Sequence, residues 1–569
     1  MRFLTLWLFI VVVVLSLGLG AFPLLDPDEG RNAEVGREMA LTNDYVMPRL
    51  DALPYLDKPI VYFAAEAAAM ELLGPTETAA RLPAFLFTLA TAAFVWWFAR
   101  RVWTAEQALM AAIMTLATPL TIAFSRTVIF DSALAFFVTV AIGCFYLACH
   151  PERSEGTGGS GGALDDATGA TRPPRSLAHA RDDTKWNVLA WAAIGFGVIT
   201  KGPVAILLPL LVAIPYAIRR KRFAALWSWW GLAAFALVIA PWVWAISRAV
   251  PDFLHYVVVT ETAQRVATKA LKRTGPPWYF VPFLLFGALP WTVVVVVEGL
   301  GVARSRGTAR PRDRETSQPI LYLALWLIVP FVFFSISQSK RPQYILPLMP
   351  AVALLAARVW CDSARGRRWA GGVMMAFGAV LVAAPWFVRL RPEYGPAART
   401  SAIVLGALAL IGGALALLPR RYLALAGITL PVLAMPLAVN PVINAVAARR
   451  STAAFVRQLP LGPETEVVGI EAYTGSMSFY LRRPVVVVTP DGEEFTSNYI
   501  IRHYSRFAGS PTLKPPSWLP SALPDKVNVD KVFIVRANDR AHRALLEQRG
   551  LRLVAGSARY VAYAPHRMR

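Results

Sequence analysis

The first 39 residues combine a membrane segment with a charged loop. Residues 3–39 read FLTLWLFIVVVVLSLGLGAFPLLDPDEGRNAEVGREM, so an almost wholly apolar run is followed by seven charged residues within 26–38. A bilayer core about 30 Å thick needs about 20 apolar residues in an α-helix. The run therefore predicts a membrane-spanning helix, and the charges that follow it are expected at one face of the membrane.

The composition of the whole chain is that of a polytopic membrane protein. Of its 569 residues, 56% are hydrophobic and only 17% are charged, and the mean hydropathy is +0.47. These values exclude an ordinary soluble domain. The formal net charge of +22 could indicate a nucleic-acid partner, but basic loops that orient a membrane protein explain it equally well. We therefore expect no nucleic-acid partner.

Twelve further apolar segments follow the first, which gives thirteen predicted spans. Arginine-rich loops at 100–101, 219–222, 304–314, 365–368 and 420–421 all fall on one side of this arrangement. The positive-inside rule makes that side cytoplasmic, so the loop 23–78 and the tail after residue 440 are outside. The predicted spans are 3–22, 79–99, 105–123, 129–149, 187–200, 202–218, 223–246, 278–299, 318–337, 344–360, 369–388, 401–418 and 422–439.

Two parts of the chain lack the membrane pattern. Residues 150–186 are rich in Gly, Ser and Arg, which predicts a disordered cytoplasmic insert. After about residue 446, EVVGIEAY, PVVVVT and KVFIVRA have the pattern of strands, and STAAFVRQL and DRAHRALLEQRG have helical spacing. We therefore predict a membrane domain over 1–445, with its first external loop at 23–78, and a small external α/β domain over 446–569.

The charges after the first span have two explanations. Asp26, Pro27 and Glu29 fit the N-cap, N1 and N3 positions of a helix, where Asp and Glu form a capping box. Asp28 is not needed for this cap, since first-turn acids only complement the helix dipole, and its spacing puts it on one face with Arg31. We therefore predict that Asp26 and Glu29 serve the helix start and that Asp28 serves function. The alternative is that Asp28 also serves the helix start alone.

Further charged residues, and one tyrosine, fall at the outer ends of the predicted spans. Charges at a membrane face are costly and usually mark a substrate path. Asp131 could instead cap its span, and Lys201 could simply extend its ammonium to the interface. The set comprises Asp57, Lys58, Asp131, Lys201, Glu261, Arg265, Lys340, Arg341 and Tyr344.

The residue types in this set limit the chemistry. Several cations can hold an anionic group, and one or two carboxylates can accept a proton. The sequence shows no Walker A motif and no GxGxxG after a strand. The combination suits transfer of a group away from a phosphate, and a lipid phosphate is the natural donor at this depth in the membrane.

Taken in order, several stretches resemble the bacterial ArnT-type glycosyltransferases of the GT-C superfamily, which also contains protein O-mannosyltransferases. The resemblance implies a GT-C fold with thirteen membrane helices, a polyprenyl-phosphate-linked sugar donor, and a site at the periplasmic face of the bacterial inner membrane. It also implies that the external domain is periplasmic. The matching stretches are PDEGRNAEVGREM at 27–39, LDKP at 56–59, FDSALAFF at 130–137, TKGP at 200–203, GPPWYFVPFLLFGALPW at 275–291 and FFSISQSKRPQYILPLMPAVALL at 333–355.

The resemblance assigns roles to single residues. It places Asp28 and Asp131 at catalytic acidic positions. It puts Asp57 where the family usually has a Glu, and Thr262 where the family often has a histidine that can bind metal. Because threonine supplies no imidazole, a zinc site on Asp57 would lack a ligand, and we expect that no cofactor is required. From the charged span ends and the resemblance together, we predict that substrate and phosphate are bound by Arg31, Lys58, Lys201, Glu261, Arg265, Lys340, Arg341 and Tyr344.

We therefore predict an integral-membrane hexosyl- or pentosyltransferase that moves a sugar from a polyprenyl phosphate to lipid A or another glycolipid. One alternative is an enzyme like the protein O-mannosyltransferases, since the same machinery suits protein hydroxyls. Another is a flippase or transporter of lipid-linked sugars. Transporters keep polar residues near the bilayer midplane, whereas here the charges gather at one face. We expect a monomer surrounded by membrane lipids.

Overall fold

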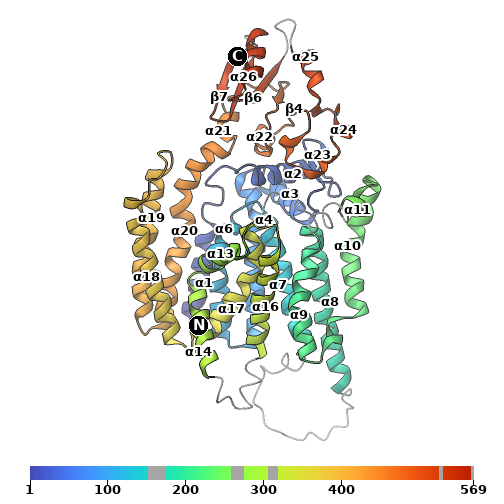
Figure 1. Cartoon of the computed structure of the whole chain (residues 1–569). Coiled ribbons are helices and arrows are strands. Elements are labelled where there is room, and N and C mark those ends of the chain that lie inside the picture. Colours follow the sequence, from blue (N-terminus) through green and yellow to red (C-terminus); the bar gives the residue numbers. More distant parts are fainter. Residues whose placement is uncertain (151–174, 258–274, 306–317, 524–529, 566–569) are drawn as a thin grey trace.

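The computed structural model describes residues 1–150, 175–257, 275–305, 318–523 and 530–565. Most helices stand side by side in one layer, and a sheet formed by the C-terminal residues lies beyond one end of that layer (Figure 1). Between the two lie α2 (Asp28–Thr42) and α3 (Val61–Leu73), which come from the segment that follows the first apolar helix.

The apolar segments of the sequence form the helical layer. Each of the thirteen predicted spans lies on a helix or on a pair of consecutive helices. The helices are α1 (Arg2–Ser16), α4 (Glu77–Val102), α5 (Ala105–Leu116), α6 (Pro119–Ser125), α7 (Asp131–Ala148), α8 (Arg175–Lys201), α9 (Val204–Arg219), α10 (Trp229–Ala249), α13 (Phe280–Gly287), α14 (Trp291–Ser305), α16 (Gln318–Ile336), α17 (Met349–Trp360), α18 (Ala364–Phe387), α19 (Gly395–Leu417) and α20 (Arg421–Arg450).

The number of membrane spans depends on how bent helix pairs are counted. Among the described residues, eight helices are long and apolar enough to cross a membrane, and ten if each bent pair forms one span. The pairs are α5 with α6, bent by 60°, and the segment 277–299, bent by 108°. Helices α1 and α9 are shorter and also apolar. The polytopic helical fold is confirmed, while the count of thirteen stays a prediction.

Local sequence signals explain where helices begin and how closely they pack. Helix α5 starts with a capping box, in which Thr104 and Gln107 bond to each other's backbone N–H. Helices α18 and α19 meet at glycines: a Cβ on Gly378 would lie 2.7 Å from the carbonyl oxygen of Gly406, and the reverse contact is equally short. Small residues therefore let these two backbones touch, as is common between membrane helices.

The C-terminal part is a six-stranded sheet with strand order β5-β4-β3-β6-β8-β7. Four strands are parallel: β3 (Glu466–Ile470), β4 (Val486–Val488), β5 (Leu513–Lys514) and β6 (Lys531–Arg536). They read as apolar runs because both faces are covered. The antiparallel edge consists of β8 (Tyr560–Ala564) and β7 (Arg552–Gly556). The predicted α/β character of this part is confirmed.

One apolar core joins this sheet to the segment beneath it. Val35 on α2 and Phe63 on α3 belong to the same buried cluster as Met477 and Phe479 of α22 (Gly475–Leu481) and Val487 of β4. The C-terminal part therefore rests on α2 and α3 through a hydrophobic contact, and it holds its place over the end of the helical layer.

Two boundaries differ from the sequence prediction. Helix α8 begins at Arg175, so residues 175–186 of the predicted disordered insert are helical instead. Residues 175–186 read RSLAHARDDTKW, and their many polar and charged side chains hid the start of the helix. Helix α20 ends at Arg450, beyond the predicted boundary at residue 445. Residues 151–174 of the insert lie outside the described residues, and the division into domains stays a prediction.

Candidate active site

The predicted capping box at the start of α2 is wrong. Pro27 occupies the N-cap position, and no side chain accepts a bond there. The Asp26 carboxylate instead accepts bonds from Ser476 of the C-terminal part, at 3.2 Å from the backbone N and 2.5 Å from Oγ. Glu29 accepts a bond from the backbone N of Leu25 at 3.0 Å, but its main partner is a buried arginine. Both acids have tertiary partners that local reasoning could not detect.

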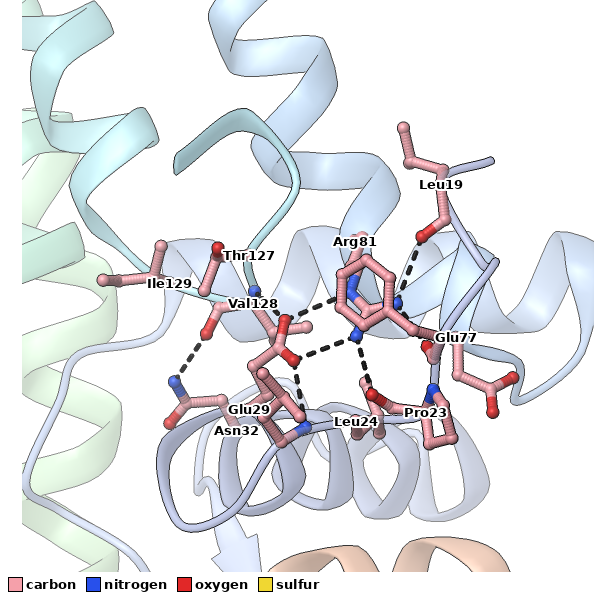
Figure 2. Close-up of polar contacts among 12 residues, drawn as sticks. Leu19, Pro23, Leu24, Glu29, Asn32, Glu77, Arg81, Thr127, Val128 and Ile129 are labelled. Carbon is pink, nitrogen blue, oxygen red and sulfur yellow. Dashed lines mark hydrogen bonds and ion pairs between the residues drawn. The ribbon is translucent and has the colours of Figure 1, made fainter. Parts of the chain in front are cut away.

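Between α2 and α4 lies a saturated polar network around Arg81 of α4 (Figure 2). Its Nε donates to Glu29 Oε1 at 3.1 Å and its Nη2 to Oε2 at 2.9 Å. The remaining donors bind the carbonyl oxygens of Leu19, Phe22 and Pro23 at 2.8–3.2 Å. Glu29 also accepts from the backbone N of Val128 at 3.0 Å. This network fastens α2 to the segments on either side of it.

Two more aspartates hold the C-terminal part in place. Asp51 accepts bonds from Ser478 Oγ at 3.0 Å and from the backbone N of Val485 at 3.2 Å. Asp57 accepts bonds from the backbone N of Asn498 at 2.8 Å and of Tyr499 at 3.0 Å. Together with Asp26, these acids receive backbone donors from three places in the C-terminal part. These bonds fix the C-terminal part over residues 23–78.

A polar cavity of about 180 Å³ lies beside α2, under residues 496–498. It brings together eight of the predicted site residues, which come from five separate stretches of the chain. They are Asp28, Arg31, Asp57, Lys58, Asp131, Lys201, Arg341 and Tyr344.

Asp28 is held between two guanidinium groups in this cavity. Its Oδ1 lies 2.7 Å from Arg31 Nη2, and its Oδ2 lies 3.2 Å from Arg341 Nη1. Arg31 also donates from Nη1 to the carbonyl oxygen and the Oγ1 of Thr496, at 3.0 and 2.7 Å. The Asp28 side chain remains 44% exposed, so a ligand can reach the carboxylate.

A second ion pair forms another wall. Asp131, the first residue of α7, pairs with Lys201 at the end of α8, and the Lys201 ammonium lies 5.1 Å from the ring centroid of Tyr344. Asp131 makes no side-chain cap bond. Lys58 donates to the carbonyl oxygen of Asp57 at 2.8 Å. Asp131 therefore does not cap its helix, and Lys201 pairs with Asp131 instead of simply extending to the membrane surface.

Some predicted residues are placed elsewhere. Lys340 does not line the cavity, and its ammonium donates to the carbonyl oxygens of Ser335 and Ser337 at 2.8 Å. These carbonyls lie in the last turn of α16 and directly after it, where no helical donor remains for them. Lys340 thus has a structural contact in the described residues, and its predicted phosphate contact stays a prediction. Glu261, Thr262 and Arg265 lie outside the described residues, and their roles stay predictions.

Within the described residues, the surroundings of Asp57 do not suit a metal ion, and the independence of a cofactor stays a prediction. Besides the two backbone donors, its Oδ1 accepts a bond from Tyr256 OH at 2.9 Å. Lys58 and Arg31 line the same cavity, and their positive charges oppose a cation. Elsewhere in the described parts, carboxylate oxygens of Glu34, Glu38 and Asp51 lie within 4.8 Å of one another. Arg37 bonds to Glu34 and Ser478 bonds to Asp51, so we interpret this group as a structural network.

Sequence reasoning missed the contribution of the C-terminal part to the cavity. Thr496 and Asn498 line it, as do Tyr55 and Gln343. The pattern Thr-Ser-Asn does mark a helix start, since Ser497 caps α23 (Asn498–Arg502). This pattern predicts the helix but not that the helix lies over the cavity. The bond between Asn498 and Asp57 joins residues more than 400 positions apart, which no local pattern indicates.

Comparison with known proteins places this geometry in a family. A family described as dolichyl-phosphate-mannose-protein mannosyltransferase matches residues 57–161. An arabinosyl transferase of Yersinia enterocolitica, named for undecaprenyl phosphate-α-4-amino-4-deoxy-L-arabinose, is 30% identical over 386 residues. That match covers 66% of this chain and 64% of the relative, so the chain spans just under two thirds of the relative's length. The equivalent Edwardsiella ictaluri protein is 30% identical over 70% of this chain and 69% of its own length.

A solved structure extends the likeness over the whole fold. The crystal structure of ArnT from Cupriavidus metallidurans bound to undecaprenyl phosphate superposes with a TM-score of 0.81 at 25% identity. The superposition covers 98% of this chain and 97% of that one, which confirms the predicted GT-C fold class. The chain belongs to the ArnT-like glycosyltransferases of the GT-C superfamily.

Proposed function

We propose that this chain transfers a sugar from a polyprenyl-phosphate donor to a glycolipid hydroxyl at the periplasmic face of the bacterial inner membrane. The observation that carries the proposal is the position of Asp28, an accessible carboxylate held between Arg31 and Arg341 in a cavity at one end of the helical layer. The names of the relatives support a polyprenyl-phosphate sugar as the donor.

The charge of the cavity suits a phosphodiester. Four cations face three carboxylates, a formal surplus of one positive charge. A sugar linked through phosphate to a polyprenol carries one negative charge, and a second develops when the sugar leaves. At 4 Å and an effective dielectric of about 20, each cation attracts such a charge by about 4 kcal/mol before desolvation is subtracted. The cations are Arg31, Lys58, Lys201 and Arg341, and the acids are Asp28, Asp57 and Asp131.

The geometry supports a direct displacement. The acceptor oxygen attacks the anomeric carbon while the bond from that carbon to the phosphate oxygen breaks, and the bonding electrons leave with the phosphate. Asp28 accepts the proton of the acceptor hydroxyl. Arg31 and Arg341 hold Asp28 in place and neutralise the phosphate as its charge grows. No step requires a metal ion.

An apolar groove beside the cavity supports lipid substrates. It has a volume of about 430 Å³ and also reaches Asp28, so one carboxylate borders both a polar and an apolar space. Phe22, Ile122, Met435 and Val439 contribute to its walls. A lipid chain in this groove would place its polar head close to Asp28.

Two classes of acceptor carry a hydroxyl that could receive the sugar. The relatives are named as arabinosyl transferases, and lipid A is the acceptor expected for that group. The match of residues 57–161 to protein mannosyltransferases favours a protein hydroxyl as the second candidate.

The test uses the full-length chain in sealed lipid vesicles with a polyprenyl-phosphate sugar that carries a radiolabel in the sugar. One sample receives lipid A and another a peptide containing serine and threonine. We expect label on the lipid and release of polyprenyl phosphate. Label on the peptide alone would support the second candidate. Label that crosses a sealed membrane without a new bond would support a flippase and overturn the proposal.

A further inference from the structure

A second and larger polar cavity, of about 700 Å³, lies in the C-terminal part. Arg536, Asn538, Arg559, Glu494 and Thr496 are among the residues that line it. Its size is within the range that accommodates small-molecule ligands. None of the steps proposed above uses this cavity.

The cavity lies at the topological switch point of the sheet. Strand β3 pairs with β4 on one side and with β6 on the other, and all three are parallel. Residues 473–475, which follow β3, and Arg536 and Asn538, at the end of β6 and after it, line the cavity. Open α/β sheets bind ligands outside the carboxyl ends of the strands at this point. The topology thus gives a reason, independent of the cavity itself, to expect a ligand.

Glu494 indicates what kind of ligand the cavity can bind. Its side chain is 7% exposed, and its Oε1 lies 3.0 Å from Arg536 Nη2. Its Oε2 is buried and has no hydrogen-bond partner among the described residues. A buried carboxylate oxygen without a donor is costly. A ligand with hydroxyl or N–H donors would remove that cost.

The lining as a whole favours a saccharide. Two guanidinium groups, from Arg536 and Arg559, are balanced by Glu493 and Glu494, with Asp26 as a further acid. A phosphate would meet these carboxylates and offers no donor to Glu494. A saccharide has vicinal hydroxyls that donate to carboxylates and accept from guanidinium and amide groups. The mixed donors and acceptors of the cavity therefore match a sugar better than an anion.

The position of the cavity connects it with the candidate active site. Thr496 lines both cavities, and Arg31 binds Thr496 from the active-site side. Asp26 and Pro27 line the large cavity, while the next residue, Asp28, lines the small one. We propose that the large cavity binds the saccharide part of the glycolipid acceptor. This inference rests on the proposed function.

Binding can be measured without any transfer reaction. The probe is N,N′-diacetylchitobiose, a disaccharide with hydroxyl and N–H donors, and saturation-transfer NMR detects its contact with the detergent-purified full chain. Asn538→Trp fills the cavity from an exposed position, and Gln548→Trp on α26 (Arg540–Gln548) is the matched control outside it. We expect the signal to vanish in Asn538→Trp and to persist in Gln548→Trp.

Kinetics give the second readout. In Asn538→Trp and in Glu494→Gln, we expect the acceptor KM to rise about tenfold while the donor KM changes less than about twofold. An unchanged acceptor KM in both variants, with transfer intact, would overturn the saccharide site and leave the proposed function standing. Saccharide binding without any transfer would contradict the function and leave the site standing. Binding of an Ala-Ser-Ala tripeptide in place of the disaccharide would overturn the assignment to a sugar.

Discussion

Two adjacent carboxylates at the start of α2 have opposite surroundings. Glu29 is 4% exposed, and the arginine that it binds has a partner for every donor group. Asp28 is 44% exposed, and one of its two arginines, Arg31, has a buried Nε without a hydrogen-bond partner in the described residues. A saturated ion pair holds a fold together, whereas an accessible and incompletely satisfied one can bind a ligand. Of these two neighbouring residues, Glu29 therefore has a structural role, and Asp28 is the one available for chemistry.

The largest effect is expected when the saturated network loses its cation. Arg81→Met keeps the apolar stem but leaves Glu29 buried without a counter-charge, which costs about 3–5 kcal/mol. We expect little folded protein in a detergent extract, measured by size-exclusion chromatography. The double variant Arg81→Met with Glu29→Leu should recover much of the yield. Normal yield of the single variant would show that the network is not structural.

The next effect concerns the contact between Asp26 and the C-terminal part. Burial raises the pKa of Asp26 from 3.8 to about 6, against the opposing effect of the Ser476 hydrogen bonds. Between these values the unfolded chain loses a proton that the folded chain keeps, so this group lowers stability as the pH rises from about 4 to 6. Each pKa unit corresponds to about 1.36 kcal/mol, which gives about 3 kcal/mol in total.

Asp26→Asn keeps an acceptor for Ser476 and removes the titration. The difference in thermal midpoint between the variant and the wild type should therefore grow in favour of the variant from pH 4 to pH 6 and then stay constant. A midpoint difference that does not change with pH would show that Asp26 ionises normally. The comparison of the two chains cancels the other buried acids, which titrate in both.

A smaller effect is expected for a cation of the cavity. Arg341→Gln removes the charge that lies 3.2 Å from Asp28, and we expect turnover to fall about tenfold to hundredfold, or about 1.4–2.7 kcal/mol. The thermal midpoint should hardly change, because exposed ion pairs contribute little to stability. Arg358→Gln, whose pair with Asp362 lies outside the cavity, is the control. Equal turnover of the two variants would contradict a role for Arg341.

The smallest effect is expected at the cover of the cavity. Thr496→Val removes the hydroxyl that accepts from Arg31 at 2.7 Å but keeps the carbonyl that accepts at 3.0 Å. We expect a loss in kcat/KM of about three- to tenfold, since one hydrogen bond contributes about 1 kcal/mol. Thr512→Val, which affects a hydroxyl bound to Asp51 away from the cavity, is the control. A larger loss in the control would show that the effect comes from the contact between the C-terminal part and the loop 23–78, and not from the cavity.

The sequence predicted the helical layer, the sheet and most of the site, for identifiable reasons. Apolar runs and charges at their ends are local, and they indicated Asp28, Arg31, Asp131, Lys201 and Arg341. What the sequence did not show was the partner of two charged side chains: Asp26 binds Ser476, 450 residues away, and Lys340 donates to helix-end carbonyls three and five residues before it. A capping pattern reports which bond is available to a side chain, and tertiary partners decide which bond it makes.

The central claim is that Asp28 serves chemistry and Glu29 serves architecture. The direct test measures turnover and thermal midpoint on the same preparations of Asp28→Asn and Glu29→Gln. We expect Asp28→Asn to lose about 10²- to 10⁴-fold in turnover, the range of general base participation, with an unchanged midpoint. Glu29→Gln should lower the midpoint, while its folded fraction keeps most of the turnover. An Asp28→Asn enzyme that retains more than about a tenth of wild-type turnover would contradict the claim.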